Sequence, residues 1–372
     1  MLIGVPKEIV NHEYRVGLTP SSVRELIYQG HKVLVEAKAG AGIGLDDADY
    51  KSAGAVVTRN AAKIFAVADL IVKVKEPQPD EYKMLHQQQI LYTYLHLASD
   101  LEQTEGLIRS GCSAIAYETV TNARGGLPLL APMSEVAGRM SVQIGAHYLE
   151  KAQGGAGILI GGVPGVKAAN VVVIGGGIAG THAVRIALGM EANVTVIDKN
   201  SDRLRALDEL FGGGLNTIYS TVDSIEQYVV NADLVIGAVL VPGATAPKLV
   251  TRKMIKRMRP GSVVIDIAID QGGCFETSRA TTHADPVYVV DGITHYCVAN
   301  MPGSVARTST FALNNATLPF AMALANKGIK QACIDDPHLM NGLNIHAGQV
   351  TYKAVANALK LKYTSAEEAL GI

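Results

Sequence analysis

Three glycines follow a run of β-branched residues and could cradle a phosphate group. In the stretch VVVIGGGIAGTHAV, Gly175, Gly177 and Gly180 form the spacing G-x-G-x-x-G between a predicted strand and a predicted helix. The first glycine permits a tight turn, the second lets a pyrophosphate approach the backbone, and the third lets the helix pack closely on the strand. Free N–H groups and partial positive charge at the helix N-terminus would bind the phosphates. The alternative interpretation is a tight strand-to-helix turn without a ligand.

An acidic residue follows this loop at a spacing that matters for cofactor choice. Asp198 ends the next apolar run, VTVID, about 20 residues further along the chain. At this distance a carboxylate accepts hydrogen bonds from the hydroxyl groups of an adenosine ribose. Because a carboxylate repels a 2′-phosphate, the pattern favours NAD over NADP. As an alternative, Asp198 could cap the N-terminus of the following helix.

Four polar residues stand where apolar runs end, which is where ligands bind in open α/β sheets. Lys75 ends LIVKVK, and His96 falls at the end of ILYTYLHL. Arg15 lies in the loop NHEYRVG after the first predicted strand, and Asp270 follows VVIDIAI. A lysine and an arginine could hold a carboxylate or polarise a carbonyl, and a histidine transfers protons near neutral pH. Together these residues suit redox chemistry on a small acid, although each has an ordinary alternative as a solvated charge, a structural histidine or a turn-forming aspartate.

The elements that must position these residues alternate along the chain. Short apolar runs such as LIGVP, KVLVEA and LIVKVK are separated by amphipathic stretches, and a second series of this kind begins at Asn170. Such alternation predicts βαβ units. We therefore expect an α/β fold with two Rossmann-like, doubly wound parallel-sheet domains.

The same pattern predicts where the domains meet. Turn formers in NARGGLPLLAP precede helical spacing in SEVAGRMSVQIGAHYLEKA, which indicates a hinge and a connecting helix. After Met301 we expect helices alone, with a kink at Pro319 and a closing helix near residues 348–361. The prediction is a substrate domain of residues 1–130 and 305–372, into which an NAD-binding domain of residues 131–304 is inserted.

Composition narrows the possible partners. The chain has 372 residues, of which 33 are Lys or Arg and 34 are Asp or Glu. This near-zero net charge produces no overall positive electrostatic field that would attract nucleic acid or anionic lipid. Its four cysteines form no CxxC pair, which argues against a zinc site or a disulfide framework. No apolar run reaches the ~18 residues of a membrane span. We expect a cytoplasmic protein without nucleic acid or membrane partners.

Longer segments distributed along essentially the full length of the chain match one known family: IGVPKEIVNHEYRVGLTP, IVKVKEPQPDEY, LYTYLHLA, LLAPMSEVAGRMSVQIGA, VIGGGIAGTHAVRIALGMEANVTVID, AIDQGGCFETSRATTHADPVY and HYCVANMPGSVARTST. In these segments the chain resembles the alanine dehydrogenases, of the alanine dehydrogenase/pyridine nucleotide transhydrogenase family. Their agreement is far more specific than the glycine pattern alone. The resemblance implies a homohexamer that performs reversible NAD-dependent oxidative deamination of L-alanine to pyruvate and ammonium.

The resemblance also implies roles for individual residues. Arg15 and Lys75 would bind the substrate carboxylate and carbonyl, and both count with His96, the general acid–base, among the catalytic residues. Asp270 would assist proton movement beside the nicotinamide. Besides the three glycines, the implied cofactor contacts are Ser134, Ile178, Ala179, Asp198, Arg203, Ser220, Val239, Leu240, Ile267, Asp270, Arg279, Val298, Asn300 and Met301. Some family members hold magnesium with a glutamate like Glu118 and a histidine, but Lys327 stands at the histidine position here, so we predict no metal.

Three other functions fit parts of the pattern. The soluble NAD-binding subunit of a proton-translocating transhydrogenase shares the two-domain plan, but it needs a membrane partner. This interpretation also gives Lys75 and His96 no functional role. A lysine-pathway enzyme such as saccharopine dehydrogenase acts on a larger substrate and matches the motifs less well. A non-catalytic NAD-binding regulator would keep the glycine loop and lose the polar residues at the strand ends.

Overall fold

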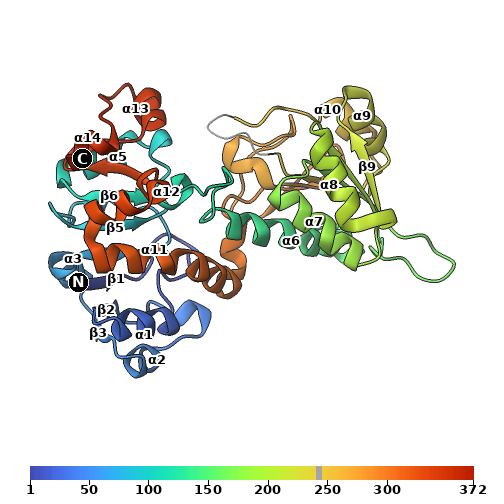
Figure 1. The fold of residues 1–372 in the computed structure, drawn as a ribbon. Coiled ribbons are helices and arrows are strands. Elements are labelled where there is room, and N and C mark those ends of the chain that lie inside the picture. Colours follow the sequence, from blue (N-terminus) through green and yellow to red (C-terminus); the bar gives the residue numbers. More distant parts are fainter. Residues whose placement is uncertain (240–244) are drawn as a thin grey trace. The chain divides into compact units, whose positions relative to one another are not determined.

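The computed structural model describes residues 1–239 and 245–372, which form two compact units. One unit consists of Met1–Met133 and Val305–Ile372, and the other of Ser134–Ser304. The chain leaves the first unit within helix α6 (Ala131–Tyr148) and returns at the 3-10 helix η7 (Met301–Val305). Each unit has its own largely parallel sheet with helices around it, which confirms the predicted fold class (Figure 1).

The sheet of the first unit has eight strands within the described residues, in the order β15-β14-β6-β5-β4-β1-β2-β3. The strands are β1 (Leu2–Val5), β2 (Lys32–Glu36), β3 (Val56–Thr58), β4 (Leu70–Val72), β5 (Ile90–Thr93), β6 (Ser113–Ala116), β14 (Leu343–His346) and β15 (Gln349–Val350). Strands β1 to β6 run parallel. Because β1 pairs with both β2 and β4, the strand order reverses between β1 and β4. Ligands bind beyond the carboxyl ends of strands at such a switch point.

Helices cover this sheet and close its core. They are α1 (Pro20–Tyr28), α2 (Asp47–Ser52), α3 (Ala61–Val67), α4 (Pro79–Tyr82), α5 (Leu101–Ser110), α11 (Ala306–Asp335), α12 (Pro337–Met340), α13 (Lys353–Leu359) and α14 (Ala366–Leu370), with 3-10 turns η1 (Ala41–Ile43), η2 (Leu97–Ser99) and η3 (Tyr117–Thr119). Ile71 of β4 and Leu91 of β5 are register partners and are fully buried. The apolar runs read from the sequence are thus the buried central strands, and the polar residues that follow them emerge at one edge.

The C-terminal segment differs from the prediction in two ways. It contributes strands β14 and β15 to the first sheet, both antiparallel to their neighbours, where helices alone were expected. These strands have four and two residues, which is too short to show a clear alternation in the sequence. In α11 the backbone leaves the helical region at Gly328 (φ 73°, ψ 169°) and not at Pro319. Glycine adopts a positive φ at little cost, which explains the interruption there.

The sheet of the second unit has seven strands in the described part of the chain, in the order β12-β13-β11-β10-β7-β8-β9. They are β7 (Asn170–Ile174), β8 (Asn193–Asp198), β9 (Leu215–Tyr219), β10 (Leu234–Gly237), β11 (Val263–Asp266), β12 (Val287–Val290) and β13 (Ile293–Tyr296). All pairs are parallel except that of β12 with β13. The strand order reverses between β7 and β10, so the glycine loop after β7 lies at the switch point.

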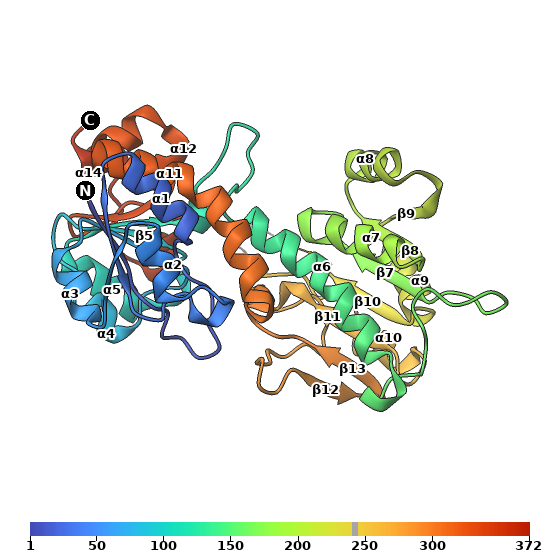
Figure 2. The same ribbon diagram turned by 90° about the horizontal axis from the view of Figure 1, so that it is seen from below.

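The helices of the second unit bring a second element close to this loop. Besides α6 they are α7 (Ile178–Gly189), α8 (Ser201–Phe211), α9 (Val222–Val230) and α10 (Arg252–Arg257), with 3-10 turns η4 (Lys151–Gln153), η5 (Gly212–Gly214) and η6 (Ile267–Gln271). Figures 1 and 2 both show α6 beside α7. A Cβ on Gly138 of α6 would lie 2.0 Å from the carbonyl oxygen of Ala179, so only glycine allows the two helices to approach this closely.

Candidate active site

The glycine loop has the backbone geometry that a bound pyrophosphate requires. Gly175 has a φ of 98°, and a Cβ on Gly180 would lie 1.8 Å from the carbonyl oxygen of Gly175. By contrast, no described atom lies within 4 Å of a Cβ built on Gly177, so the described part of the chain leaves space above this residue. Among the described side chains none caps helix α7, whose first N–H groups face that space. The loop therefore fits a dinucleotide phosphate.

Asp198 is held at the loop by backbone amides. Its Oδ2 accepts the N–H of Gly176 at 2.7 Å, and its Oδ1 accepts the N–H of Asn200 at 2.8 Å. The residue that caps helix α8 is Asn200, whose side chain accepts from the N–H groups of Asp202 and Arg203. Asp198 is therefore not the helix cap, and its carboxylate stands beside the glycine loop.

Arg203, another expected cofactor contact, crosses the same loop. Its Nε donates to the carbonyl oxygen of Gly176 at 2.5 Å, and its Nη2 donates to Oγ1 of Thr181 at 2.5 Å. These bonds tie α8 to the turn between β7 and α7. Arg203 thus stabilises the loop conformation, and its charge adds to the positive potential at the N-terminus of α7.

Most of the other expected cofactor residues follow the carboxyl ends of strands in this sheet. They are Ser220 after β9, Val239 after β10, Ile267 after β11 and Val298, Asn300 and Met301 after β13. Ile178 and Ala179 lie in the first turn of α7. Ser134 lies in α6, one helical turn before Gly138, the residue at which α6 packs closely against Ala179. Arg279 stacks on an aromatic ring, with its guanidinium carbon 4.0 Å from the centre of the Tyr288 ring. Leu240 falls outside the described residues.

Asp270 lies in η6, directly after β11, and its side chain is exposed. The turn that carries it is organised by Asp266, which is fully buried. The Asp266 carboxylate accepts from the N–H groups of Ala268 at 3.1 Å and Cys274 at 2.9 Å and from the Ser278 hydroxyl at 2.5 Å. Burial raises the pKa of Asp266, although these hydrogen bonds oppose the shift.

In the first unit, the structure places Arg15, Lys75 and His96 after β1, β4 and β5, three neighbouring strands of one sheet. Arg15 is only 3% exposed and forms a bidentate ion pair with Glu13, in which Nε lies 2.7 Å from Oε1 and Nη2 lies 2.5 Å from Oε2. Burial lowers the pKa of Arg15, but the hydrogen bonds and charge of Glu13 outweigh this effect and raise it. The guanidinium is therefore charged and held in one orientation.

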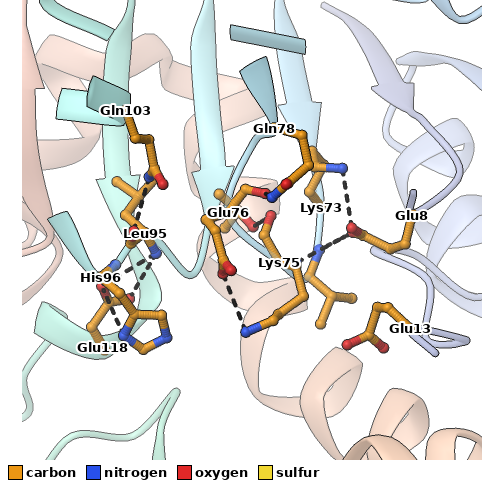
Figure 3. A network of polar contacts seen from close by, with 12 residues as sticks. Glu8, Glu13, Lys73, Lys75, Glu76, Gln78, Leu95, His96, Gln103 and Glu118 are labelled. Carbon is orange, nitrogen blue, oxygen red and sulfur yellow. Dashed lines mark hydrogen bonds and ion pairs between the residues drawn. The ribbon is translucent and has the colours of Figure 1, made fainter. Parts of the chain in front are cut away.

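Lys75 is held through its backbone. Its N–H donates to Oε1 of Glu8 at 3.3 Å, and its carbonyl oxygen accepts from the Thr93 hydroxyl at 2.8 Å. Its Nζ lies 3.2 Å from Oε2 of Glu76, an ion pair without hydrogen-bond geometry (Figure 3). The Lys75 side chain is 17% exposed, so it is only partly buried.

Glu8, which accepts the N–H of Lys75, also belongs to a buried ion cluster. The Nζ atom of Lys73 is 3.1 Å from Oε2 of Glu8 and 2.7 Å from Oε1 of Glu81, and all three side chains are at most 5% exposed. Burial lowers the pKa of Lys73, but the two glutamates more than reverse this and raise it. Burial raises the pKa of Glu8, against the opposing charge of Lys73. We call Lys73, Glu8 and Glu81 the buried triad.

His96 is more open to solvent than either cation. Its side chain is 51% exposed, its ring stacks at 6.0 Å on that of Tyr94, and its Nδ1 lies 4.0 Å from Oε1 of Glu118.

Lys327, which stands where some family members have a metal-binding histidine, forms an ion pair with Asp335, and its Nζ lies 2.5 Å from Oδ2. Among the described residues we find no cluster of three His, Cys, Asp or Glu that could bind a metal, and no helix long and apolar enough to cross a membrane.

Comparison with protein-family models decides what kind of protein carries these two sets of residues. The alanine dehydrogenase/PNT N-terminal domain matches residues 4–137, and the alanine dehydrogenase/PNT C-terminal domain matches residues 141–353. The chain belongs to the alanine dehydrogenase/PNT family. Membership confirms the resemblance read from the sequence.

Individual members of the alanine dehydrogenase/PNT family agree with this assignment. The chain is 61% identical to an alanine dehydrogenase of Halomonas elongata and 54% identical to one of Methanococcus maripaludis, in both cases over 100% of each chain. A solved L-alanine dehydrogenase matches with a TM-score of 0.94 and 52% identity, covering 97% of this chain and 99% of the other. A transhydrogenase from Sinorhizobium meliloti matches with a TM-score of 0.81 and 25% identity, covering 95% and 100%.

The structure also shows supporting acidic residues that sequence reasoning did not select. Glu8 and Glu13 each hold one of the predicted substrate-binding residues, and Asp266 holds the turn of Asp270. The available signal was weak: Glu8 and Glu13 both follow the first apolar run, in the short loop after it. Such residues are as common on solvated surfaces, so their burial could not be inferred without the fold.

Proposed function

We propose that this protein is an L-alanine dehydrogenase, which oxidises L-alanine with NAD and water to pyruvate, ammonium and NADH, and runs the reaction in reverse. The observation that carries the proposal is the 61% identity to a curated alanine dehydrogenase over the full length of both chains. Identity to the transhydrogenase structure is only 25%, so the transhydrogenase alternative has less support.

The space that the described residues leave above Gly177, and the N-terminus of α7 that none of their side chains caps, fit NAD, with Asp198 as partner of the adenosine ribose. Bound NAD supplies the oxidising power, because its nicotinamide accepts the hydride from Cα of alanine. The chain contributes orientation: Arg15 and Lys75 hold the carboxylate and carbonyl of the three-carbon acid. Fixed orientation of this kind is among the largest contributions that a protein makes to a reaction rate.

His96 is the proposed general acid–base. Its exposed imidazole takes a proton from the water that attacks the imine carbon and returns one to the departing ammonia. Asp270, exposed on η6, is proposed to assist proton movement beside the nicotinamide. Because hydride loss requires a neutral amine, oxidation of alanine should be faster at alkaline pH.

The direct test is the appearance of NADH absorbance when the protein and NAD are mixed with L-alanine, and then with D-alanine, glycine or L-glutamate. We expect turnover with L-alanine and slow or no turnover with the others. Oxidation of a larger amino acid in preference to alanine, or no oxidation of any, would overturn the proposal.

Two finer properties belong to the same proposal. We propose a homohexamer, which light scattering would reveal as six times the mass of one chain. We also propose a cytoplasmic location, supported by four free and buried cysteines that suit a reducing compartment.

A further inference from the structure

The turn that carries His96 directs its backbone N–H groups at a single carboxylate. The N–H of His96 donates to Oε1 of Glu118 at 2.7 Å, and the N–H of Leu95 lies 3.2 Å and 3.3 Å from the two carboxylate oxygens (Figure 3). This arrangement follows from the sheet, because β5 and β6 are neighbours and Thr93 is the register partner of Ala116. The residues just beyond each strand end therefore meet.

The backbone of this turn lies in a region that residues other than glycine adopt only uncommonly. His96 has a φ of 51° and a ψ of 35°, in the left-handed region. The carbonyl oxygens of the turn are also bound: Nε2 of Gln103 donates to the Leu95 oxygen at 2.9 Å, and the Ser99 hydroxyl donates to the His96 oxygen at 3.0 Å. Glu118 is the partner on the N–H side.

Glu118 also lies near the ring of His96. Oε1 is 4.0 Å from Nδ1, which is too far for a hydrogen bond but close enough to attract a protonated imidazole. The side chain of Glu118 is 16% exposed, so water screens this attraction only in part. Nδ1 is therefore the ring nitrogen on the side of the carboxylate. Nε2, the other ring nitrogen, is then the one assigned to proton exchange with the substrate.

We propose that Glu118 is a positioning residue, which holds His96 in its left-handed turn and fixes the orientation of the imidazole for proton transfer. The proposal rests on the proposed function, in which His96 is the general acid–base. Glu118 does not itself contact substrate, and its effect on the reaction passes through His96.

The first experiment compares Glu118→Ala, Glu118→Gln and the control Glu105→Ala, which removes an exposed glutamate from neighbouring α5. Glu118→Ala should lower kcat for alanine oxidation by at least about tenfold, a part of the 10²–10⁴ that general acid–base catalysis contributes. Its NADH Kd should stay within about twofold of wild type. Glu118→Gln should lose less, since an amide oxygen still accepts the backbone N–H groups. Glu105→Ala should match wild type.

The second experiment is a double-mutant cycle that separates positioning from a general structural role. If Glu118 acts through His96, Glu118→Ala should have almost no effect on kcat in the His96→Ala protein. Should Glu118→Ala fail to fold, Glu118→Gln takes its place in the cycle.

The outcomes distinguish this inference from the function on which it rests. An equal loss in both backgrounds, or a wild-type kcat for Glu118→Ala, would overturn the role of Glu118 while the wild-type protein still oxidises alanine. A wild-type protein that does not oxidise alanine would overturn the proposed function itself.

Discussion

Replacing Lys73 by methionine would expose how much the first unit depends on its buried triad. Each ion pair is worth about 5 kcal/mol at an effective dielectric of about 20, against a desolvation cost of several kcal/mol per ion. The substitution keeps the length of the side chain but leaves Glu8 and Glu81 without their shared cation at 3.1 Å and 2.7 Å. We expect a loss of about 3–5 kcal/mol, the usual cost of removing one partner from a buried pair.

The assay is urea unfolding followed by far-ultraviolet circular dichroism. With a slope of about 2–3 kcal/mol per molar urea, the transition of the first unit should move to lower urea by about 1–2.5 M. Lys83→Met, which removes an exposed lysine at the end of α4, should change stability by less than about 0.5 kcal/mol. The triple change Lys73→Met, Glu8→Gln and Glu81→Gln should recover much of the loss, because no buried charge remains.

The effect should also depend on pH in a defined direction. Because Lys73 lowers the pKa of Glu8, the Lys73→Met substitution should raise that already elevated pKa further. A carboxyl group whose folded-state pKa is raised stabilises the fold when protonated, and this stabilisation is lost as pH rises through that pKa. The Lys73→Met defect should therefore be smaller near about pH 5 than near about pH 8. A defect that is absent, or that grows as pH falls, would refute the reasoning.

Three further substitutions test the proposed site. Gly177→Ala should change the free energy of unfolding by less than about 0.5 kcal/mol, since no described atom lies within 4 Å of the new Cβ. The same substitution should weaken NAD binding in a fluorescence titration, and an unchanged NAD affinity would count against a phosphate at this point. Asp198→Ala should weaken NAD binding and reduce the preference over NADP, measured as the ratio of kcat/KM with each cofactor; an unchanged ratio would remove the ribose assignment. His96→Ala should lower kcat by about 10²–10⁴ with little change in the NADH Kd, so a near-normal rate would exclude it as the acid–base.

The sequence predicted best what depends on local chain geometry. The glycine loop was visible because its three glycines and the strand before them are contiguous, and the buried β7 strand and helix α7 lie as expected. The alternatives for Asp198 could not be separated, since only the structure shows that Asn200 caps the next helix. The family resemblance supplied the expected cofactor contacts that no spacing could indicate, and these stay predictions.

Contacts between residues far apart in the chain could not be predicted. The buried triad joins Glu8 to Lys73, and the His96 turn depends on Glu118 beyond the next strand. Both pairings require the order and register of strands, which a single sequence does not specify. The short strands β14 and β15 were missed for a similar reason, because β14 is defined by its pairing with β6.

That pairing sets an order of events during synthesis. Strand β14 lies between β15 and β6, so the sheet that begins at Leu2 is completed only when residues 343–350 have been added. The inserted unit, Ser134–Ser304, has by then emerged with all seven of its described strands and has a hydrophobic core of its own. Domains generally fold as units during translation. We therefore expect the inserted unit to reach its native structure on the ribosome before the last strands of the first unit, β14 and β15, have been synthesised.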